Sequence, residues 1–216
     1  MSKKKDYTAQ FIGDVESYDK NKPFVVWNPQ GYNGRLFEYS YDRAGTKDVE
    51  LFRGNKLEVD PCPEHVIYSN VPEKTVKIFD TLPIGTYPIF NKRAISILEQ
   101  ICPNDFQAFP ITVINSPKKK KLEPFENHDY FIINITNTVD AIDKDNSTLE
   151  YLTDGVTPYG VRKLALKPNA MLQHDLSRDG FLHSQKLVSY NLAIEFIKQE
   201  ITGISFKLDI KCGLSS

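Results

Sequence analysis

The clearest pattern of apolar and polar positions lies in FNKRAISILEQICP, residues 90–103. Apolar side chains recur there every three or four residues, at Ala94, Ile95, Ile97, Leu98 and Ile101. Asn91 is a suitable N-cap, and Pro103 stands where a helix would end. The spacing predicts a helix of about three turns.

The same order of signals returns in FLHSQKLVSYNLAIEFIKQEITGISFKLDI, residues 181–210. Ser189 is a suitable N-cap, and Gly203 is interpreted as the stop signal before the strand ISFKLDI. The apolar face of this second predicted helix consists of Leu192, Ala193, Phe196 and Ile197. The side chains of the two regions hardly match, so we interpret a repeated plan and not a sequence duplication.

Two strands are predicted between these helices. FQAFPITVI, residues 106–114, contains Pro110, which favours a sheet edge because proline cannot donate to a ladder. The lysine-rich connection SPKKKKLEP, residues 116–124, is expected to be exposed. YFIINITNTV, residues 130–139, is the second predicted strand, and it leads into three closely spaced aspartates, Asp140, Asp143 and Asp145.

The beginning of the chain has a different pattern. Short aromatic runs such as PFVVW, residues 23–27, and RLFEY, residues 35–39, alternate with turn signals made of Gly, Asn and Pro. We predict an irregular, strand-rich segment over residues 1–82, packed on the same core as an α+β unit with two capped helix-strand units over residues 83–216. The expected fold class is α+β, with a mixed or antiparallel sheet and a few helices, because strict βαβ alternation is absent.

Composition and charge disfavour several kinds of protein. With 216 residues, 40% of them hydrophobic, the chain can bury a substantial core. Its 27 Lys and Arg residues nearly balance 28 Asp and Glu residues, so we expect neither nucleic acid nor an anionic membrane as a partner. The sequence has no signal peptide and no apolar run long enough to cross a membrane, which predicts a cytoplasmic protein. Cys62, Cys102 and Cys212 form no CxxC pair and are expected to be reduced thiols, mostly buried.

Motifs for catalysis or for a cofactor are absent from the sequence. It contains no GxSxG, HExxH, GxxxxGK[ST] or GxGxxG pattern, so we expect no cofactor, no metal site and no enzymatic activity. The rival hypothesis is a small hydrolase or metal-dependent enzyme that uses Asp140, Asp143 and Asp145 with His128 or His174. It requires at least two of these side chains to converge in one pocket.

The aspartates have two further interpretations. Counting from Asp143, the spacing superficially resembles a calcium loop, but Thr148 stands where the sharp turn requires glycine. Short carboxylates at strand ends commonly bond to turn backbone, which we expect for Asp140 and Asp143, with Asp145 as the more exposed residue.

A partner-binding surface is the remaining role for this region. Between Asn137 and Gly160, five acidic residues are opposed only by Lys144, which gives a net charge of −4. Acidic groups beside aromatic residues are typical of an interface with a steering rim and aromatic anchors. The candidate partner-binding residues are Asp140, Asp143, Asp145, Glu150, Tyr151, Asp154 and Tyr159. These patterns alone are equally consistent with a protein-interaction module that does not bind a toxin.

Three stretches within residues 80–210, taken in order, carry a family resemblance: YPIFNKRAISILEQICPNDFQAFPITV, YFIINITNTVDAIDKDNS and the closing segment from Phe181. Together they resemble the eleventh immunity-protein family of bacterial polymorphic toxin systems. The matching positions are Tyr130, Asn134, Val139, Asp140, Asp143, Ser147, Ser189, Ala193, Ile194, Ile201, Thr202, Gly203 and Phe206. The chain departs from the pattern in its KKKK insertion and in Asn91, where serine is usual.

The resemblance implies an α+β cytosolic protein that is encoded beside a toxin. Such a protein binds the catalytic domain of the toxin and blocks it. The family has no catalytic motif that can be carried over to this sequence. The partner expected from the resemblance is therefore a cognate toxin domain.

Overall fold

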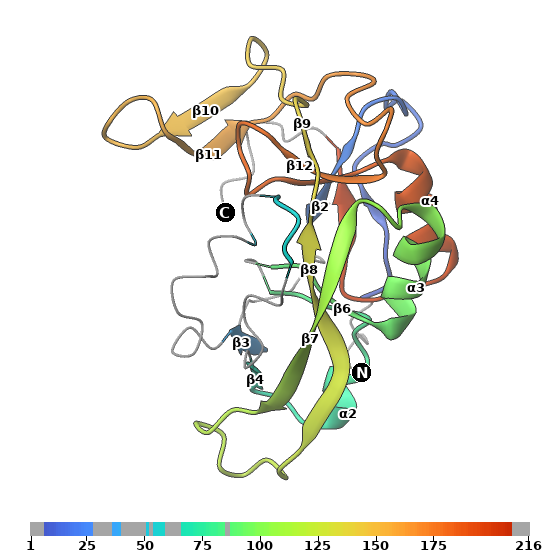
Figure 1. Cartoon of the computed structure of the whole chain (residues 1–216), viewed down its shortest axis with the longest axis vertical. Helices are drawn as coiled ribbons and strands as arrows, with labels where there is room; N and C mark the ends of the chain where they lie inside the picture. Colours follow the sequence, from blue (N-terminus) through green and yellow to red (C-terminus); the bar gives the residue numbers. More distant parts are fainter. Residues whose placement is uncertain are drawn as a thin grey trace.

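The computed structural model describes residues 7–27, 36–39, 51, 54–58, 66–84 and 87–208. Within these residues the strands form two six-stranded mixed sheets and a separate two-stranded hairpin (Figure 1). The first sheet contains, in spatial order, β1 (Phe11–Ile12), β14 (Ser205–Lys207), β2 (Phe24–Trp27), β13 (Lys186–Val188), β12 (Leu176–Asp179) and β9 (Thr138–Val139). The second contains β3 (Phe37–Tyr39), β4 (Val66–Ser69), β7 (Phe106–Asn115), β8 (Glu126–Ile135), β6 (Ile89–Asn91) and β5 (Thr81–Leu82). The hairpin consists of β10 (Thr148–Tyr151) and β11 (Pro158–Lys163).

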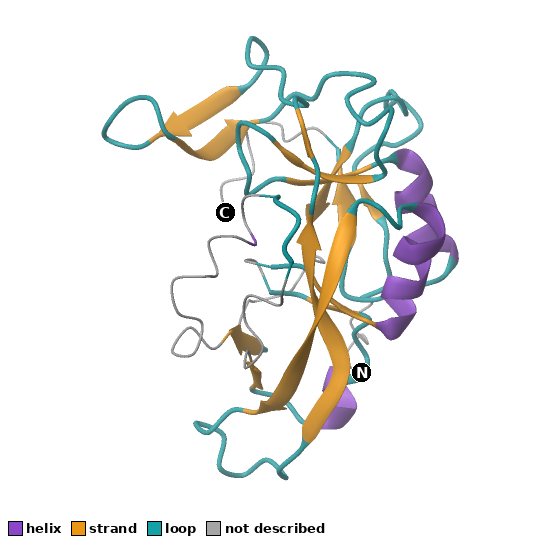
Figure 2. Ribbon diagram, in the orientation of Figure 1, coloured by secondary structure: helices purple, strands orange, loops and turns teal. Residues whose placement is uncertain are grey.

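The helices of the described residues are short. They are α2 (Glu73–Val76), α3 (Lys92–Ile101) and α4 (Tyr190–Lys198). Figure 2 shows α3 and α4 side by side along one flank of the molecule, while strands make up most of the rest. The fold is therefore consistent with the predicted α+β class but is strand-rich, and both six-stranded sheets mix parallel and antiparallel pairs.

Both predicted helix caps are confirmed. The side chain of Asn91 accepts a hydrogen bond from the backbone N–H of Ala94 at 3.1 Å, and Ser189 accepts one from Leu192 at 3.2 Å. These bonds satisfy N–H groups that have no partner inside the first turn of a helix. The predicted apolar face of each helix is largely buried in a cluster that includes residues of both sheets.

Three clusters of buried side chains hold the layers together. The first joins α3 and α4 to both sheets and includes Phe24 and Phe196. The second lies against the second sheet and includes Tyr130. Neighbouring strand residues point to opposite faces of a sheet, and Val25, next to Phe24, belongs to the third cluster. This third cluster includes Ile142 and supports the candidate site described below.

The prediction of one continuous strand over residues 130–139 is wrong at its end. β8 stops at Ile135, and the chain resumes as β9 in the other sheet. The residues between them bond to Asp105: Thr136 N–H donates to its carbonyl at 2.9 Å, and Asn137 Nδ2 donates to its carboxylate at 2.6 Å. The carbonyl of Asn137 already accepts from the N–H of Arg178 in β12, at 3.0 Å. The chain therefore changes sheets just before the aspartates.

The role assigned to Gly203 also differs from the prediction. α4 ends at Lys198 with Gln199 as its C-cap, so Gly203 is not the stop signal of this helix. Gly203 has a φ of 91°, and a Cβ at this position would lie 1.9 Å from the carbonyl oxygen of Thr81. Glycine is required here because the strand β5 crosses too close for any side chain.

The connection between β7 and β8 agrees with the prediction of an exposed, lysine-rich segment. Lys118–Lys121 are exposed at the end of this long hairpin, away from the β10–β11 hairpin (Figure 1). β4 pairs with β7 only from Thr112 onward, so Pro110 lies outside the described part of that ladder. Its missing N–H therefore removes no bond between these two strands.

Several predictions concern residues outside the described part of the chain. The run PFVVW contains β2, as expected, whereas Cys62, His65 and Cys212 lie outside the described residues. The division of the chain after residue 82 stays a prediction.

Two further expectations concern the burial of Cys102 and the presence of membrane-spanning helices. Cys102 is buried, as expected, and burial raises the pKa of its thiol to about 12. None of the described helices has both the length and the apolar character needed to cross a membrane.

Candidate functional site

The segment from Asp140 to Lys167 forms one end of the molecule, next to β9 and β12 (Figure 1). It contains a turn with the three aspartates, then the β10–β11 hairpin, and then a return to the third buried cluster at Leu164 and Leu166. All seven candidate partner-binding residues belong to this segment.

A buried carboxylate fixes the base of the turn. Asp179 is fully buried, and its Oδ2 accepts hydrogen bonds from the backbone N–H groups of Ala141 and Ile142, both at 3.0 Å. Its Oδ1 accepts from Phe181 and Leu182, both at 2.9 Å. Asp179 thus joins two chain segments and determines where Asp140 and Asp143 leave the core. The sequence analysis did not select Asp179.

The three aspartates of the turn have different surroundings. Asp140 is paired with Lys167 Nζ at 2.6 Å, and its side chain is 75% exposed. The expectation that Asp140 would be a mainly structural residue with little exposure is therefore wrong. Asp143 accepts bonds from the backbone N–H of Asn146 at 3.2 Å and from its side chain at 2.8 Å, as expected for a turn residue. These bonds from Asn146 hold the pKa of the Asp143 carboxyl below its usual value. Asp145 is exposed, as expected.

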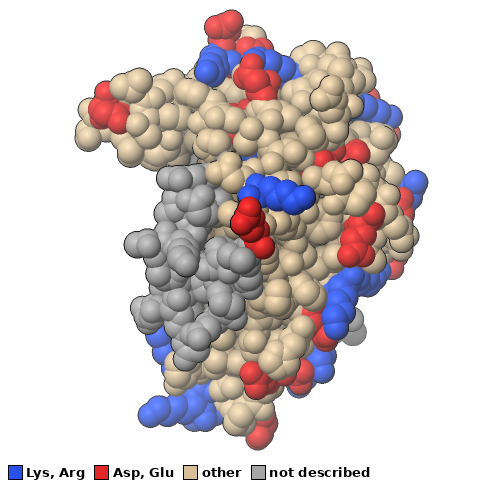
Figure 3. Space-filling model, in the orientation of Figure 1, with Lys and Arg blue, Asp and Glu red and all other residues tan. Residues whose placement is uncertain are grey.

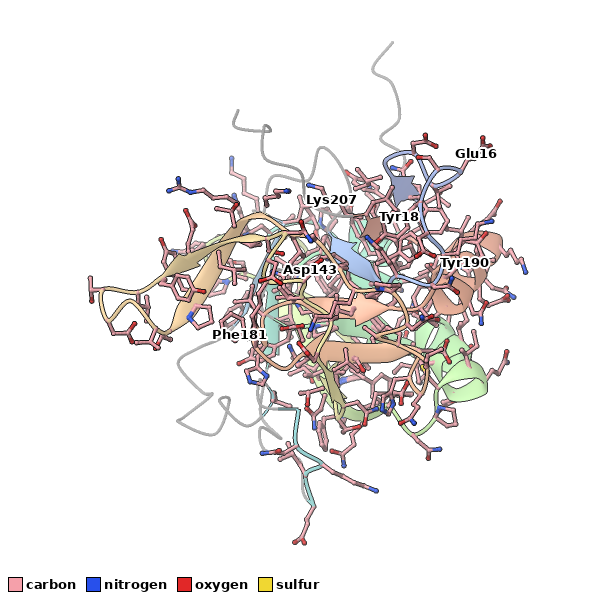
Figure 4. All side chains as sticks on the ribbon, turned by 90° about the horizontal axis from the view of Figure 1, so that it is seen from above. Glu16, Tyr18, Asp143, Phe181, Tyr190 and Lys207 are labelled. Atoms are coloured by element: carbon pink, nitrogen blue, oxygen red, sulfur yellow. The ribbon has the colours of Figure 1, made fainter. Side chains whose placement is uncertain are left out.

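A cation–π contact also holds this turn in place. Lys144 Nζ lies 3.8 Å from the centre of the Phe181 ring. Phe181 belongs to the connection between β12 and β13, and Figure 4 shows it on the same side of the molecule as Asp143 and the base of the hairpin. The turn is therefore attached at its backbone through Asp179 and at its surface through Phe181.

The β10–β11 hairpin has internal polar contacts along its length. Glu150 Oε1 accepts a hydrogen bond from Arg162 Nε at 2.7 Å across the two strands. Asp154, in the connecting turn, accepts bonds from the N–H groups of Val156 and Thr157 and from the Thr157 hydroxyl. The bonds from Thr157 and Val156 lower the pKa of Asp154. Both carboxylates thus stabilise the hairpin itself.

Both candidate aromatic residues are exposed on this hairpin. Tyr151 is 43% exposed and Tyr159 is 57% exposed. Two neighbours, Leu152 and Val156, are exposed as well and were not selected by the sequence analysis. The available signal was their position beside the turn residues Thr153–Gly155, where apolar residues are unusual unless they serve an interaction.

Pairing changes the charge expected for this region. The count of −4 ended at Gly160, but the fold adds Arg162, Lys163 and Lys167 to the same end of the molecule. Residues 137–167 contain five acidic and four basic residues, which gives a formal charge of −1. The surface has separate acidic and basic groups rather than one acidic patch, and the projecting hairpin is largely without charge in Figure 3.

The enzymatic hypothesis receives no support from the described geometry. His174 Nδ1 lies 2.8 Å from Asp105, and His128 Nδ1 lies 3.2 Å from Thr112, so both histidines contact residues other than the three aspartates. Among the described residues, no group of three or more His, Cys, Asp or Glu side chains is arranged so that it could hold a metal ion. The calcium-loop alignment also fails, because Asp154 bonds within the hairpin turn, on the far side of β10 from Asp143.

A polar hollow of about 470 Å³ lies beside the start of α4. His174, Asp175 and Ser189 contribute to its lining. Ser189 donates to the Asp175 carboxylate and caps α4, while His174 is bonded to Asp105. These contacts hold helix α4 and the strand β12 in place, so a structural role accounts for all three residues.

Comparison with known proteins identifies a family for this chain. No curated protein matches the chain. A model of the immunity protein family Imm11 matches residues 31–209, a span that includes the second sheet, the strands β9, β12, β13 and β14 of the first sheet, α3, α4 and the β10–β11 hairpin. Since this match covers most of the 216 residues, the chain belongs to the Imm11 immunity protein family.

Proposed function

We propose that this protein neutralises a cognate bacterial toxin by binding the toxin domain tightly, in the cytoplasm and without catalysis of its own. The observation that carries this proposal is membership of an immunity protein family over most of the chain. An inhibitor of this kind needs a stable interface, because a toxin that dissociates resumes its activity.

The proposed contact surface consists of Asp140, Asp143, Asp145, Glu150, Tyr151, Asp154 and Tyr159. Their position at one end of the molecule, on a turn and a hairpin, supports this assignment (Figure 1). Exposed tyrosines beside carboxylates suit an interface in which aromatic anchors supply affinity and charges supply orientation. Neither a nucleic acid nor a membrane is part of the proposed complex.

Co-expression with the toxin domain encoded by the neighbouring gene tests the function. We expect survival of the bacteria and co-purification of a stoichiometric complex. Survival without a complex would instead support the enzymatic hypothesis. No rescue, or no toxin gene beside this one, would contradict the proposed function.

Charge reversal tests the contribution of the aspartates. Replacing Asp140 and Asp145 with lysine is expected to slow association with the toxin domain at least about tenfold at low salt, because rim charges act mainly on the association rate. Asp143 is left intact since it holds the turn through Asn146. Stopped-flow or surface-binding kinetics at two salt concentrations would measure the effect.

A matched control for this variant lies at the other end of the molecule. Glu123→Lys with Glu126→Lys makes the same change in net charge at exposed positions of the β7–β8 hairpin. We expect this control to associate at nearly the normal rate. Equal association rates for the two double variants would contradict the placement of the charged rim.

A further inference from the structure

The turn of the β10–β11 hairpin carries an unusual concentration of exposed apolar side chains. We define the hairpin tip as Tyr151, Leu152, Val156 and Tyr159, with exposures of 43%, 49%, 74% and 57%. Among the described residues the remaining large exposed hydrophobic side chains are Ile78 and Leu172, so four of six occur within nine residues. Apolar residues gathered in this way on a soluble surface mark a site of interaction.

The conformation of the hairpin tip is already fixed in the free protein. Asp154 Oδ1 accepts from the N–H groups of Val156 and Thr157 at 2.9 Å, and Oδ2 accepts from the Thr157 hydroxyl at 2.6 Å. Leu152 N–H donates to the carbonyl of Thr157, and Gly155 has a φ of 69° that suits glycine. An ordered loop loses little conformational entropy on binding, which favours affinity.

The base of the hairpin is attached to the core, whereas its tip projects beyond it. Leu149 and Val161 face each other across the strands and pack on the third buried cluster. Between the pairs Glu150–Gly160 and Tyr151–Pro158 the register shifts, so Tyr159 has no cross-strand partner. Such bulges commonly redirect a side chain next to a functional site. Figure 1 shows the two strands extending away from the body.

We propose that the hairpin tip inserts into a concave, largely apolar cleft of the toxin domain, the catalytic cleft, and inhibits the toxin by occluding it. This inference rests on the proposed function. A narrow convex element fits a cleft rather than a flat surface, and ligand clefts of enzymes are concave and mostly apolar with a few polar groups. A cleft also encloses both faces of a two-stranded hairpin and therefore buries its strands together with its tip.

Charge and buried surface area distinguish the toxin cleft from other partners for the hairpin tip. Residues 148–163, which form the hairpin, contain Glu150 and Asp154 together with Arg162 and Lys163, so the hairpin has no net charge and suits a largely apolar cleft. A segment without net positive charge is also not attracted to an anionic membrane, which binds basic segments. Contact between the tips of two copies would bury only four side chains on each, less than the roughly 1,200 Å² of a stable interface.

Removal of the apolar tip tests the inference. The double variant Leu152→Ser with Val156→Ser is expected to bind the toxin domain at least about 30-fold more weakly, since truncated anchors dominate such interfaces. Its unfolding midpoint should be unchanged because both side chains are exposed. Isothermal titration calorimetry with the purified toxin domain would give the dissociation constant.

Leu172→Ser is the matched control. Leu172 is 79% exposed and belongs to the loop before β12, outside the hairpin. We expect this variant to bind within about twofold of the unaltered protein, because isolated exposed apolar residues contribute little. Equal affinity of the tip variant and the Leu172 variant, with intact binding by the unaltered protein, would overturn this inference and leave the proposed function standing. Absence of binding by the unaltered protein would contradict the proposed function itself.

The mode of inhibition tests the assignment to the catalytic cleft. Occlusion predicts competition, so the apparent inhibition constant should rise in proportion to substrate concentration above KM. Inhibition that is independent of substrate would overturn the cleft assignment. Vesicles of mixed neutral and anionic lipid should not bind the protein, and tip-dependent binding to them would equally overturn it.

Discussion

Asp179→Ala is expected to lower the free energy of unfolding by about 4 kcal/mol, because it leaves buried backbone donors without an acceptor. The carboxylate is fully buried and accepts four N–H groups, from Ala141, Ile142, Phe181 and Leu182. Each unsatisfied donor in a dry site costs about 1–3 kcal/mol, although the costs are not fully additive. Since two of these donors, Ala141 and Ile142, lie in the candidate binding turn, we also expect weaker toxin binding.

Urea unfolding of the purified variants would measure this loss. Asp179→Asn keeps one carbonyl-type oxygen and should destabilise the protein by about half as much, because it still satisfies one pair of donors. Asp145→Ala, an exposed aspartate of the same turn, should change the free energy by less than about 0.5 kcal/mol. An Asp179→Ala variant as stable as Asp145→Ala would show that the four bonds do not hold this region in solution.

Gly203→Ala is expected to destabilise the protein by a similar amount, about 4 kcal/mol, and to reduce its soluble yield. The new Cβ would stand 1.9 Å from the Thr81 carbonyl oxygen, and a φ of 91° is unfavourable for alanine. The backbone cannot simply move away, because Thr81 N–H donates to the carbonyl of Thr202 at 2.9 Å and Gly203 N–H donates to Tyr7. The substitution therefore forces apart three segments of the chain.

Two further variants separate the causes of this effect. Gly155→Ala shares the positive φ, at 69°, but its Cβ would meet no atom within 4 Å, so it should cost only about 1 kcal/mol. Thr202→Val removes the hydroxyl that contacts Asp80 and Ile78 and should cost about 2 kcal/mol without a clash. Equal losses for the two glycine variants would contradict the close approach to Thr81. If Gly203→Ala does not fold, Thr202→Val still reports on the neighbouring contact between the same two chain segments.

These contacts explain what the shared family positions do. Thr202 and Gly203 hold the chain against β5, and Tyr130 donates its hydroxyl to the buried carbonyls near α2. Asn134 is fully buried and donates to the backbone of Asn55 at 2.8 Å. The positions that carry the resemblance therefore mainly preserve the fold, and the hairpin tip lies outside them.

Elements governed by local interactions were predictable from the sequence. The caps Asn91 and Ser189 each bond to an N–H three residues later, so a short window contains both partners. The apolar spacing of α3 and α4 likewise repeats within one or two turns. For the candidate site, the same local reasoning located the turn after β9 and selected Tyr151 and Tyr159, which are exposed.

Features that depend on distant partners were not predictable in this way. The break between β8 and β9 results from bonds to Asp105, about thirty positions earlier in the chain. The pairing of Asp140 with Lys167 joins residues 27 positions apart, and Lys167, Arg162 and Lys163 together offset most of the acidic charge that the sequence suggested. Gly203 was assigned to a helix end because its neighbour Thr81 is remote in sequence.

The sequence by itself determined the two capped helices, the strands between them and the membership of an immunity protein family. Only the tertiary structure decided that Leu152 and Val156 are exposed together with two tyrosines, and that Asp179 supports the turn beside them. Exposure depends on which surfaces the rest of the chain covers. A periodic pattern identifies residues that prefer burial, but the packing of distant segments decides which of them stay in contact with water.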